Sequence, residues 1–181
     1  MIQSFVRNLD PVDRARVGSE IVRFNHRLAD TGLFTDEALA RLIDEHPRSE
    51  MTICTMKENP PPDETWIAGE ANGLSGAELV EAARRGALWV SPRSAMTRNP
   101  RYKAVFDLAM ADFARATGLK ILTADAAVLI SGARMGIFFH VDPAETMLWH
   151  VRGTKTIHVY PPKEDYVTEE YLEELHAEML K

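Results

Sequence analysis

The chain has 181 residues, 45% of them apolar, and a formal net charge of −6. This length fits one domain, or a small domain with a helical extension, and the apolar fraction is enough for a real core. The negative balance, without any basic tract, argues against general nucleic-acid binding.

The cysteine content and the length of the apolar runs indicate in which compartment the protein is located. Cys54 is the only cysteine, which excludes an intrachain disulfide and a multi-cysteine metal cluster and fits a reducing compartment. The first residues lack the apolar core of a signal peptide, and no apolar run is long enough to span a bilayer. We therefore expect a soluble, cytoplasmic protein with no membrane partner.

Helical patterns dominate the first part of the chain. Asp10 precedes Pro11, an arrangement typical of a helix N-terminus, and predicts a helix that runs towards Leu28. A second helix is predicted after Thr35, with acidic residues in its first turn and an end before Pro47. Its apolar stripe consists of Leu39, Leu42 and Ile43.

The middle of the chain alternates between strand and helix signals. Loose alternation of apolar and polar residues predicts a short strand at 51–57. The proline-rich stretch at 58–64 then interrupts any regular structure, as a linker or an ordered loop. Ser75 and Glu78 have capping-box spacing and predict a further helix, which Gly86 is placed to end.

The pattern changes after Gly118. Before it, a short strand is predicted at 87–91, and a helix is predicted to begin at Pro100. After it come short β-rich runs separated by Gly, Pro or Asp. These runs cover residues 119–132, 135–142, 146–151 and 154–162. A last, acidic helix is predicted from Thr168.

The order of elements indicates the fold class. Helices come first, then strands, then a helix, which favours an α+β fold with an antiparallel sheet over alternating βαβ units. We therefore predict a mainly helical region at 1–118 and a β-rich region with a C-terminal helix at 119–181.

His140 and Asp142 form an ionisable pair inside one predicted strand. Residues two apart project from the same face of a strand, so this imidazole and carboxylate would lie side by side. Such a pair can supply two of the three ligands of the 2-His-1-carboxylate triad of non-haem Fe(II) oxygenases. A purely structural His–Asp hydrogen bond is consistent with the same spacing.

The residues that follow this pair make the pattern more specific. Gly153 and Lys155 occupy a G-x-K turn, and the next run closes in an aromatic residue and two prolines at 160–162. This order resembles that of the JmjC-type, cupin-like Fe(II)/2-oxoglutarate oxygenases, a family that includes an asparaginyl hydroxylase. The resemblance is strong over 128–162 and weaker over the helical stretch at 73–89.

The resemblance implies a cupin-like double-stranded β-helix, or jelly roll, with a helical N-terminal part packed against it. It implies an Fe(II)- and 2-oxoglutarate-dependent dioxygenase, a hydroxylase, in which His140 and Asp142 hold the iron. Lys155 would bind the distal carboxylate of 2-oxoglutarate, with help from Thr146, and Leu148 would form a wall of the same pocket. The substrate would be a protein side chain or a small molecule.

Strand parity from Asp142 would turn Ala144, Thr146 and Leu148 inward if no bulge intervenes. His150 shares this parity and would line the substrate pocket, although a hydrogen-bonded core histidine fits equally well. An ammonium inside a barrel needs an anion, which suits a co-substrate role for Lys155, whereas the alternative is a strand-edge lysine that reaches water. The three tryptophans, Trp66, Trp89 and Trp149, are interpreted as core residues, and His158 is expected to face outward.

One part of the family pattern has no counterpart here. The third iron ligand of these enzymes is a second histidine several strands further along, and neither His150, His158 nor His176 has the right context. We expect the chain to be a fragment of a longer enzyme. Completion by a second chain, and a non-catalytic cupin-like binding or interaction module, are the alternatives. Open barrel edges would also favour a homodimer.

Overall fold

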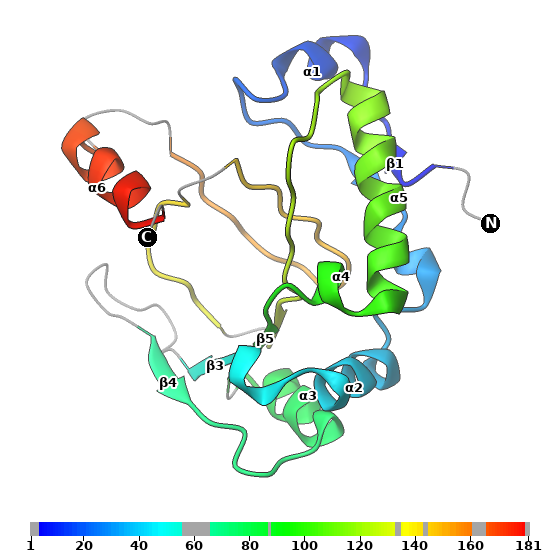
Figure 1. Cartoon of the computed structure of the whole chain (residues 1–181), viewed down its shortest axis with the longest axis vertical. Helices are drawn as coiled ribbons and strands as arrows, with labels where there is room; N and C mark the ends of the chain where they lie inside the picture. The colour runs from blue at the N-terminus through cyan, green and yellow to red at the C-terminus, as the bar shows by residue number, and fades with distance from the viewer. Residues whose placement is uncertain are drawn as a thin grey trace.

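The computed structural model describes residues 4–55, 66–86, 88–132, 135–142, 145–160 and 166–179. Within these ranges the chain is α+β, as predicted, with six α-helices and two small antiparallel sheets (Figure 1). The first elements are β1 (Val6–Arg7), α1 (Pro11–Arg16), β2 (Asn25–His26), η1 (Leu28–Thr31), α2 (Asp36–Glu45), η2 (Arg48–Glu50) and β3 (Met51–Thr55). The later elements are β4 (Ile67–Gly69), α3 (Gly76–Arg84), β5 (Trp89–Pro92), α4 (Ala95–Arg98), α5 (Pro100–Thr117), β6 (Ile130–Ser131) and α6 (Glu169–Met179).

The helices begin where the capping residues predict. The Thr35 hydroxyl accepts the N–H of Ala38 and starts α2. At α3, the Ser75 hydroxyl accepts the N–H of Glu78, and the Glu78 carboxylate accepts the N–H of Ser75 at 2.8 Å, which completes the capping box. The helix that follows Asn99 ends before Gly118, as expected, because Gly118 takes the left-handed conformation that stops a helix.

The first helix is shorter than its pattern indicates. The prediction that it runs towards Leu28 is wrong, because α1 ends at Arg16 and Gly18 follows with a φ of 89°. None of the α1 residues is buried, so little packing supports a longer helix. The chain instead returns to pair β2 with β1, with Val6 opposite His26.

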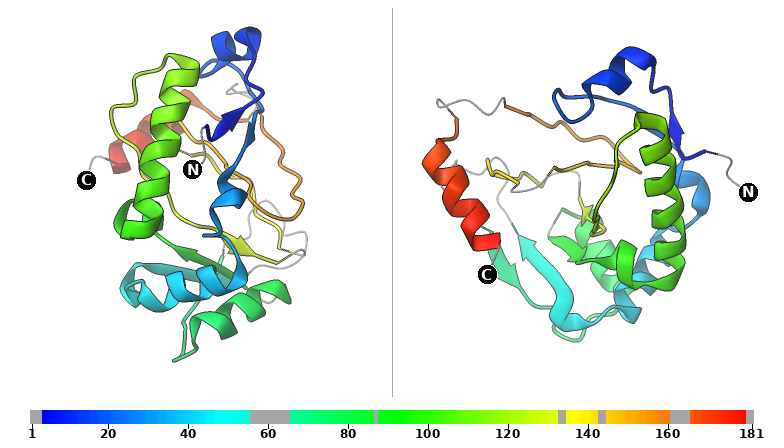
Figure 2. Two further views of the ribbon diagram at one scale, coloured as in Figure 1. Left: turned by 90° about the vertical axis from the view of Figure 1, so that its right-hand side faces the viewer. Right: turned by 45° about the horizontal axis from the view of Figure 1, so that its top comes forward.

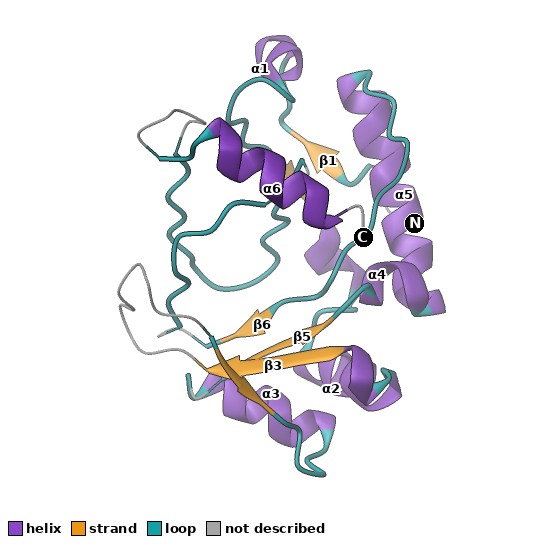
Figure 3. Ribbon diagram, turned by 60° about the vertical axis from the view of Figure 1, so that its left-hand side comes forward, coloured by secondary structure: helices purple, strands orange, loops and turns teal. Residues whose placement is uncertain are grey.

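The larger sheet has the order β4-β3-β5-β6, and all of its pairs are antiparallel. It confirms the strands predicted near Met51 and near Trp89. Ile53 and Val90 face each other in the central pair, and both are buried. Helices α2 and α3 pack together beside this sheet (Figure 3), so the main core lies between the helices and the strands.

Close helix packing depends on one small residue. Gly76, at the start of α3, lies so near α2 that an added Cβ would meet the Ala40 carbonyl oxygen at 2.0 Å. Across the contact, the side chains of Leu42, Ile43 and Leu79 have no exposed surface. The stripe predicted for α2 is therefore confirmed as its core face.

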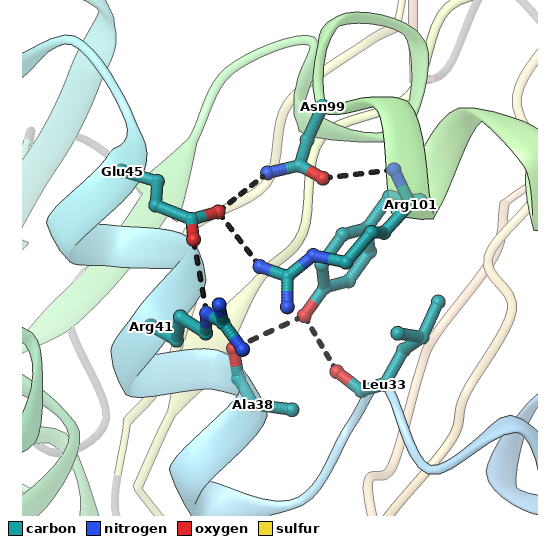
Figure 4. A network of polar contacts seen from close by, with 7 residues as sticks. Leu33, Ala38, Arg41, Glu45, Asn99 and Arg101 are labelled. Carbon is teal, nitrogen blue, oxygen red and sulfur yellow. Dashed lines mark hydrogen bonds and ion pairs between the residues drawn. The ribbon is translucent and has the colours of Figure 1, made fainter.

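A polar network joins the end of α2 to the start of α5 (Figure 4). The Glu45 carboxylate accepts hydrogen bonds from Arg41, Asn99 and Arg101 at 3.0, 3.1 and 2.7 Å. Beneath it, the buried Tyr102 hydroxyl donates to the Leu33 carbonyl at 2.6 Å, and burial raises the pKa of Tyr102 to about 12.

Both views of Figure 2 show α1 and β1 beside α5, which completes the helical part.

The β-rich region after Gly118 departs most from expectation. Of the four runs predicted there, Ile130–Ser131 alone forms a strand among the described residues, and the other described residues of these runs belong to neither a helix nor a strand. Figure 1 shows these segments as loops between α5 and α6. The described residues therefore form no jelly roll. A strand needs a neighbour whose N–H and C=O groups meet it in register, whereas β-rich composition only shows that residues suit such a neighbour.

Strand β6 links the two predicted regions. It pairs with β5 through Ile130 opposite Val90 and Ser131 opposite Trp89, so one sheet contains strands from both sides of residue 118. Gly132 lies tightly against the end of α3, where an added Cβ would be 2.2 Å from the Ala83 carbonyl oxygen. The last predicted helix is confirmed as α6, and the Thr168 hydroxyl accepts the N–H of Tyr171 in its first turn.

Among the described residues, none of the helices has both the length and the apolar character required to cross a lipid bilayer.

Candidate metal centre

His140 and Asp142 lie together in the extended segment 135–142. His140 Nε2 is 3.7 Å from Asp142 Oδ1, and the two side chains are 41% and 49% exposed. The two side chains are thus near one another, as the two-residue spacing predicts, although this segment has no strand neighbour among the described residues.

A backbone carbonyl fixes the tautomer of His140. Its Nδ1 lies 3.1 Å from the carbonyl oxygen of Phe138. A carbonyl can only accept, so Nδ1 carries the proton and Nε2 is left with its lone pair in the neutral ring. Metal-binding histidines commonly make this type of hydrogen bond, because it orients the ring and makes the other nitrogen a better ligand.

Nε2 and the Asp142 carboxylate face each other at 3.7 Å, which is too long for a direct hydrogen bond, and both side chains are nearly half exposed. Both atoms are therefore accessible to a ligand from solvent, including a divalent metal ion. Imidazole nitrogen and carboxylate oxygen are a donor set that suits Fe(II) and its first-row neighbours.

The separation of the two donors fits a common metal ion approximately. Bonds of about 2.1 Å to one ion put two ligands at right angles about 3 Å apart, so a small side-chain rotation closes the observed gap. His140 and Asp142 therefore fit as two ligands. Among the described residues, no group of three or more His, Cys, Asp and Glu side chains could hold a metal ion. The side chain of His176 lies outside the described part of the chain.

An aromatic wall, consisting of Trp66, Trp89 and Phe138, borders this pair. The Trp66 ring lies 4.7 Å from the Phe138 ring and 6.3 Å from the His140 imidazole, measured between centroids. Trp89 meets Trp66 edge-on at 5.5 Å. Trp66 is exposed rather than a core residue, so its interpretation as core is wrong. Its place beside His140 depends on pairing of β4, β3 and β5 and carries no local sequence signal.

The residues implied for the co-substrate lie on the solvent-facing part of the extended segments. Lys155 and Thr146 are exposed, and Leu148 is 48% exposed. Because the described residues form no barrel, the inward positions predicted by parity have no counterpart there, and these roles stay predictions. Ala144 lies outside the described residues. His158 is exposed, which agrees with its expected outward direction.

His150 closes the turn that precedes Lys155. Its Nε2 donates to the Gly153 carbonyl at 3.1 Å, and Gly153 has a φ of 81°, which favours glycine. His150 is exposed and is therefore not a core histidine. Its neighbour Trp149 packs at 5.3 Å against the rings of both Phe24 and His26.

His26 supports the turn from the N-terminal part of the chain. Its Nδ1 accepts the N–H of Leu28 at 3.3 Å. Burial lowers the pKa of His26; a hydrogen bond to the backbone of His150 opposes that effect, and charge on His150 would add to it. The lowered pKa favours the neutral imidazole, which packs against Trp149.

Arg152 connects this turn to the helical part. Its Nη1 donates to the Phe34 carbonyl at 2.7 Å and lies 2.8 Å from Asp36 Oδ1. Asp36 also pairs with Arg84 of α3. A shallow groove of about 320 Å³ lies alongside. It is lined by Ala29, Phe34, Thr35, Asp36, Glu37, Val151 and Arg152. Nothing in the sequence near Arg152 indicates a partner 118 residues away.

Comparison with known proteins adds no relative: no protein-family model, no curated protein and no solved structure matches this chain.

Proposed function

We propose that this chain carries the His-x-Asp part of the iron site, and the co-substrate lysine, of a JmjC-type, cupin-like Fe(II)- and 2-oxoglutarate-dependent oxygenase. The observation that carries the proposal is the pair His140–Asp142, whose facing atoms are 3.7 Å apart. The Phe138 carbonyl supports it, because it leaves Nε2 of His140 available as a ligand.

In this function His140 and Asp142 hold Fe(II) through one nitrogen and one oxygen, and a second histidine from outside the described residues completes the triad. Bound Fe(II), together with 2-oxoglutarate, supplies the O₂ chemistry that hydroxylates a C–H bond. Lys155 pairs its ammonium with the distal carboxylate of 2-oxoglutarate, and the Thr146 hydroxyl orients the same group. Leu148 and the aromatic wall would give the site an apolar border.

The fold and location belong to the same proposal. The extended segments 135–142 and 145–160 become strands of a double-stranded β-helix when neighbouring strands pair with them. A homodimer is one assembly that can cover such open edges. A cytoplasmic location suits a ferrous centre, and the buried Cys54 thiol stays reduced there.

The proposal is tested by anaerobic Fe(II) titration with and without 2-oxoglutarate, followed by the weak visible charge-transfer band of the ternary complex. We expect the band in the wild type where the assembly or the full-length protein supplies the second histidine. Asp142→Ala and His140→Ala should weaken Fe(II) binding by more than the roughly 10- to 100-fold that the loss of an outer hydrogen bond costs. His158→Ala removes an exposed histidine and is the matched control, with unchanged binding.

Two outcomes would contradict the proposal. Unchanged iron stoichiometry in Asp142→Ala would show that iron binds elsewhere. A wild-type chain that binds neither Fe(II) nor 2-oxoglutarate, alone or in its assemblies, would instead favour the non-catalytic cupin-like binding or interaction module.

A further inference from the structure

Arg152 holds the turn at 150–153 against the rigid part of the molecule. One nitrogen of its guanidinium contacts the Phe34 carbonyl at 2.7 Å and the Asp36 carboxylate at 2.8 Å. Asp36 is the first residue of α2, and its carboxylate also pairs with Arg84 near the end of α3. The clamp formed by Arg152, Phe34 and Asp36 therefore ties the turn to the two best-packed helices.

Further contacts define the conformation of the same turn. The His150 ring donates to the Gly153 carbonyl at 3.1 Å, and Trp149 packs against Phe24 and His26. Val151 is packed against the main core. Lys155 follows Gly153 by two residues and is itself exposed. The direction in which the chain leaves the turn therefore governs where the Lys155 ammonium can reach.

The contacts of this clamp contribute little to the free energy of unfolding of the whole chain. The side chain of Arg152 is 52% exposed and that of Asp36 is 31% exposed. Ion pairs in such positions add little to the free energy of unfolding, because solvent screens them. They can still select one conformation of a local segment, since that requires much less free energy than holding the whole fold.

We infer that Arg152 is a positioning residue that presents Lys155 to 2-oxoglutarate, and so sets the affinity of the site for this co-substrate; the inference rests on the proposed function. Arg152 does not touch the co-substrate. It acts by keeping the turn at 150–153 on α2, so that the binding-competent position of Lys155 is already populated. Apparent affinity falls in proportion to that population.

The test measures the turn and the affinity separately. In the metal-free full chain, amide hydrogen exchange of 149–156 should accelerate in Arg152→Ala while exchange in α5 stays unchanged. In the Fe(II)-loaded chain, the apparent Kd for 2-oxoglutarate should rise roughly five- to tenfold, as expected if the competent turn is populated 10–20% of the time. The Kd for Fe(II) alone should not change.

Three further variants separate positioning from charge. Arg152→Lys keeps the charge and one contact, so it should restore part of the affinity. Asp36→Ala removes the ion pair of the clamp but leaves the Phe34 contact and the positive charge of Arg152. Positioning by the clamp predicts weaker 2-oxoglutarate binding in this variant, whereas simple attraction of the dianion predicts equal or tighter binding. Arg84→Ala leaves both contacts of Arg152 intact and should stay within about twofold of the wild type.

Failure of this inference can be distinguished from failure of the proposed function. A wild-type band together with an unchanged Kd for 2-oxoglutarate in Arg152→Ala overturns this inference alone, as does unchanged exchange of 149–156. Equal or tighter binding in Asp36→Ala also overturns it. A wild type that shows no Fe(II)–2-oxoglutarate band, either alone or within the full-length protein or assembly that supplies the second histidine, overturns the proposed function, and this inference with it.

Discussion

Two regions of this molecule use apolar residues in opposite ways. In the helical and sheet part, Leu42 and Val90 are completely buried among neighbours from α3, α5 and the sheet. In the segments after Gly118, Leu122 is 83% exposed and Val159 is 58% exposed. The difference shows that the first region has a core packed from its own residues, whereas the second has large apolar side chains that the described residues leave exposed.

The largest expected effect tests this contrast with one pair of matched substitutions. Leu42→Ala should lower the free energy of unfolding by about 3 kcal/mol, because it leaves a cavity in a fully packed site. Leu122→Ala removes the same atoms from an exposed site and should stay within about 0.5 kcal/mol of the wild type. Urea denaturation measures both. Similar losses in the two variants would mean that Leu122 is covered in solution.

The next effect concerns the tie between the N-terminal strand and α5. The buried Asp112 carboxylate accepts the N–H groups of Phe5 and Val6 at 2.7 and 2.8 Å and the Ser4 hydroxyl at 2.7 Å, and it pairs with Arg115. Burial alone would raise the pKa of Asp112, but these hydrogen bonds outweigh it and lower the pKa below its ordinary value of 3.8.

Asp112→Ala should therefore cost about 2 kcal/mol near neutral pH, because two buried N–H groups lose their acceptor. A depressed folded-state pKa gives stability that is complete above the unfolded pKa and is lost as pH falls through the folded value. The difference from the wild type should thus be constant above pH of about 5 and shrink below about 4. Asp107→Ala, at an exposed site on the same helix, is the control. A difference that persists at low pH would contradict this assignment.

The smallest effect concerns the junction between the regions. Gly132→Ala would put a methyl group 2.2 Å from the Ala83 carbonyl, so the chain after β6 must shift away from the end of α3, which disturbs the pairing of β6 with β5. We expect a loss of about 1–2 kcal/mol, with faster amide exchange at 130–131 and no change in α2. Gly69→Ala meets Ile53 only at an ordinary 3.4 Å and should be nearly neutral. Exchange that increases equally in α2 would show that the two regions unfold together.

Local patterns predicted the helices well because each signal and its partner are close in the chain. Asp10, Thr35 and Ser75 cap the helices that follow them, each through an N–H three residues along the chain. The first helix was predicted too long because its pattern lacked a packing partner. The β-rich runs show the same limit, since pairing depends on neighbours distant in sequence.

The candidate site also combines features that the local sequence predicts with features that it does not. The side-by-side position of His140 and Asp142 follows from two-residue spacing alone. The positions of Trp66 and Arg152 in the site could not be predicted from the sequence, because their partners lie 74 and 118 residues away. Neither residue is part of a sequence motif that indicates a chemical role. Both become visible only when β4 and α2 are in place.

The Trp66 ring beside His140 also gives the protein an internal optical reporter. An open-shell ion such as Fe(II) or Co(II) at Nε2 would be close enough to the indole, whose centroid is 6.3 Å from the imidazole, to quench its emission. The chain has three tryptophans, so Trp66→Phe would leave the emission of Trp89 and Trp149 and remove most of the metal-dependent signal. Occupancy of this centre could then be followed at micromolar protein without any added probe.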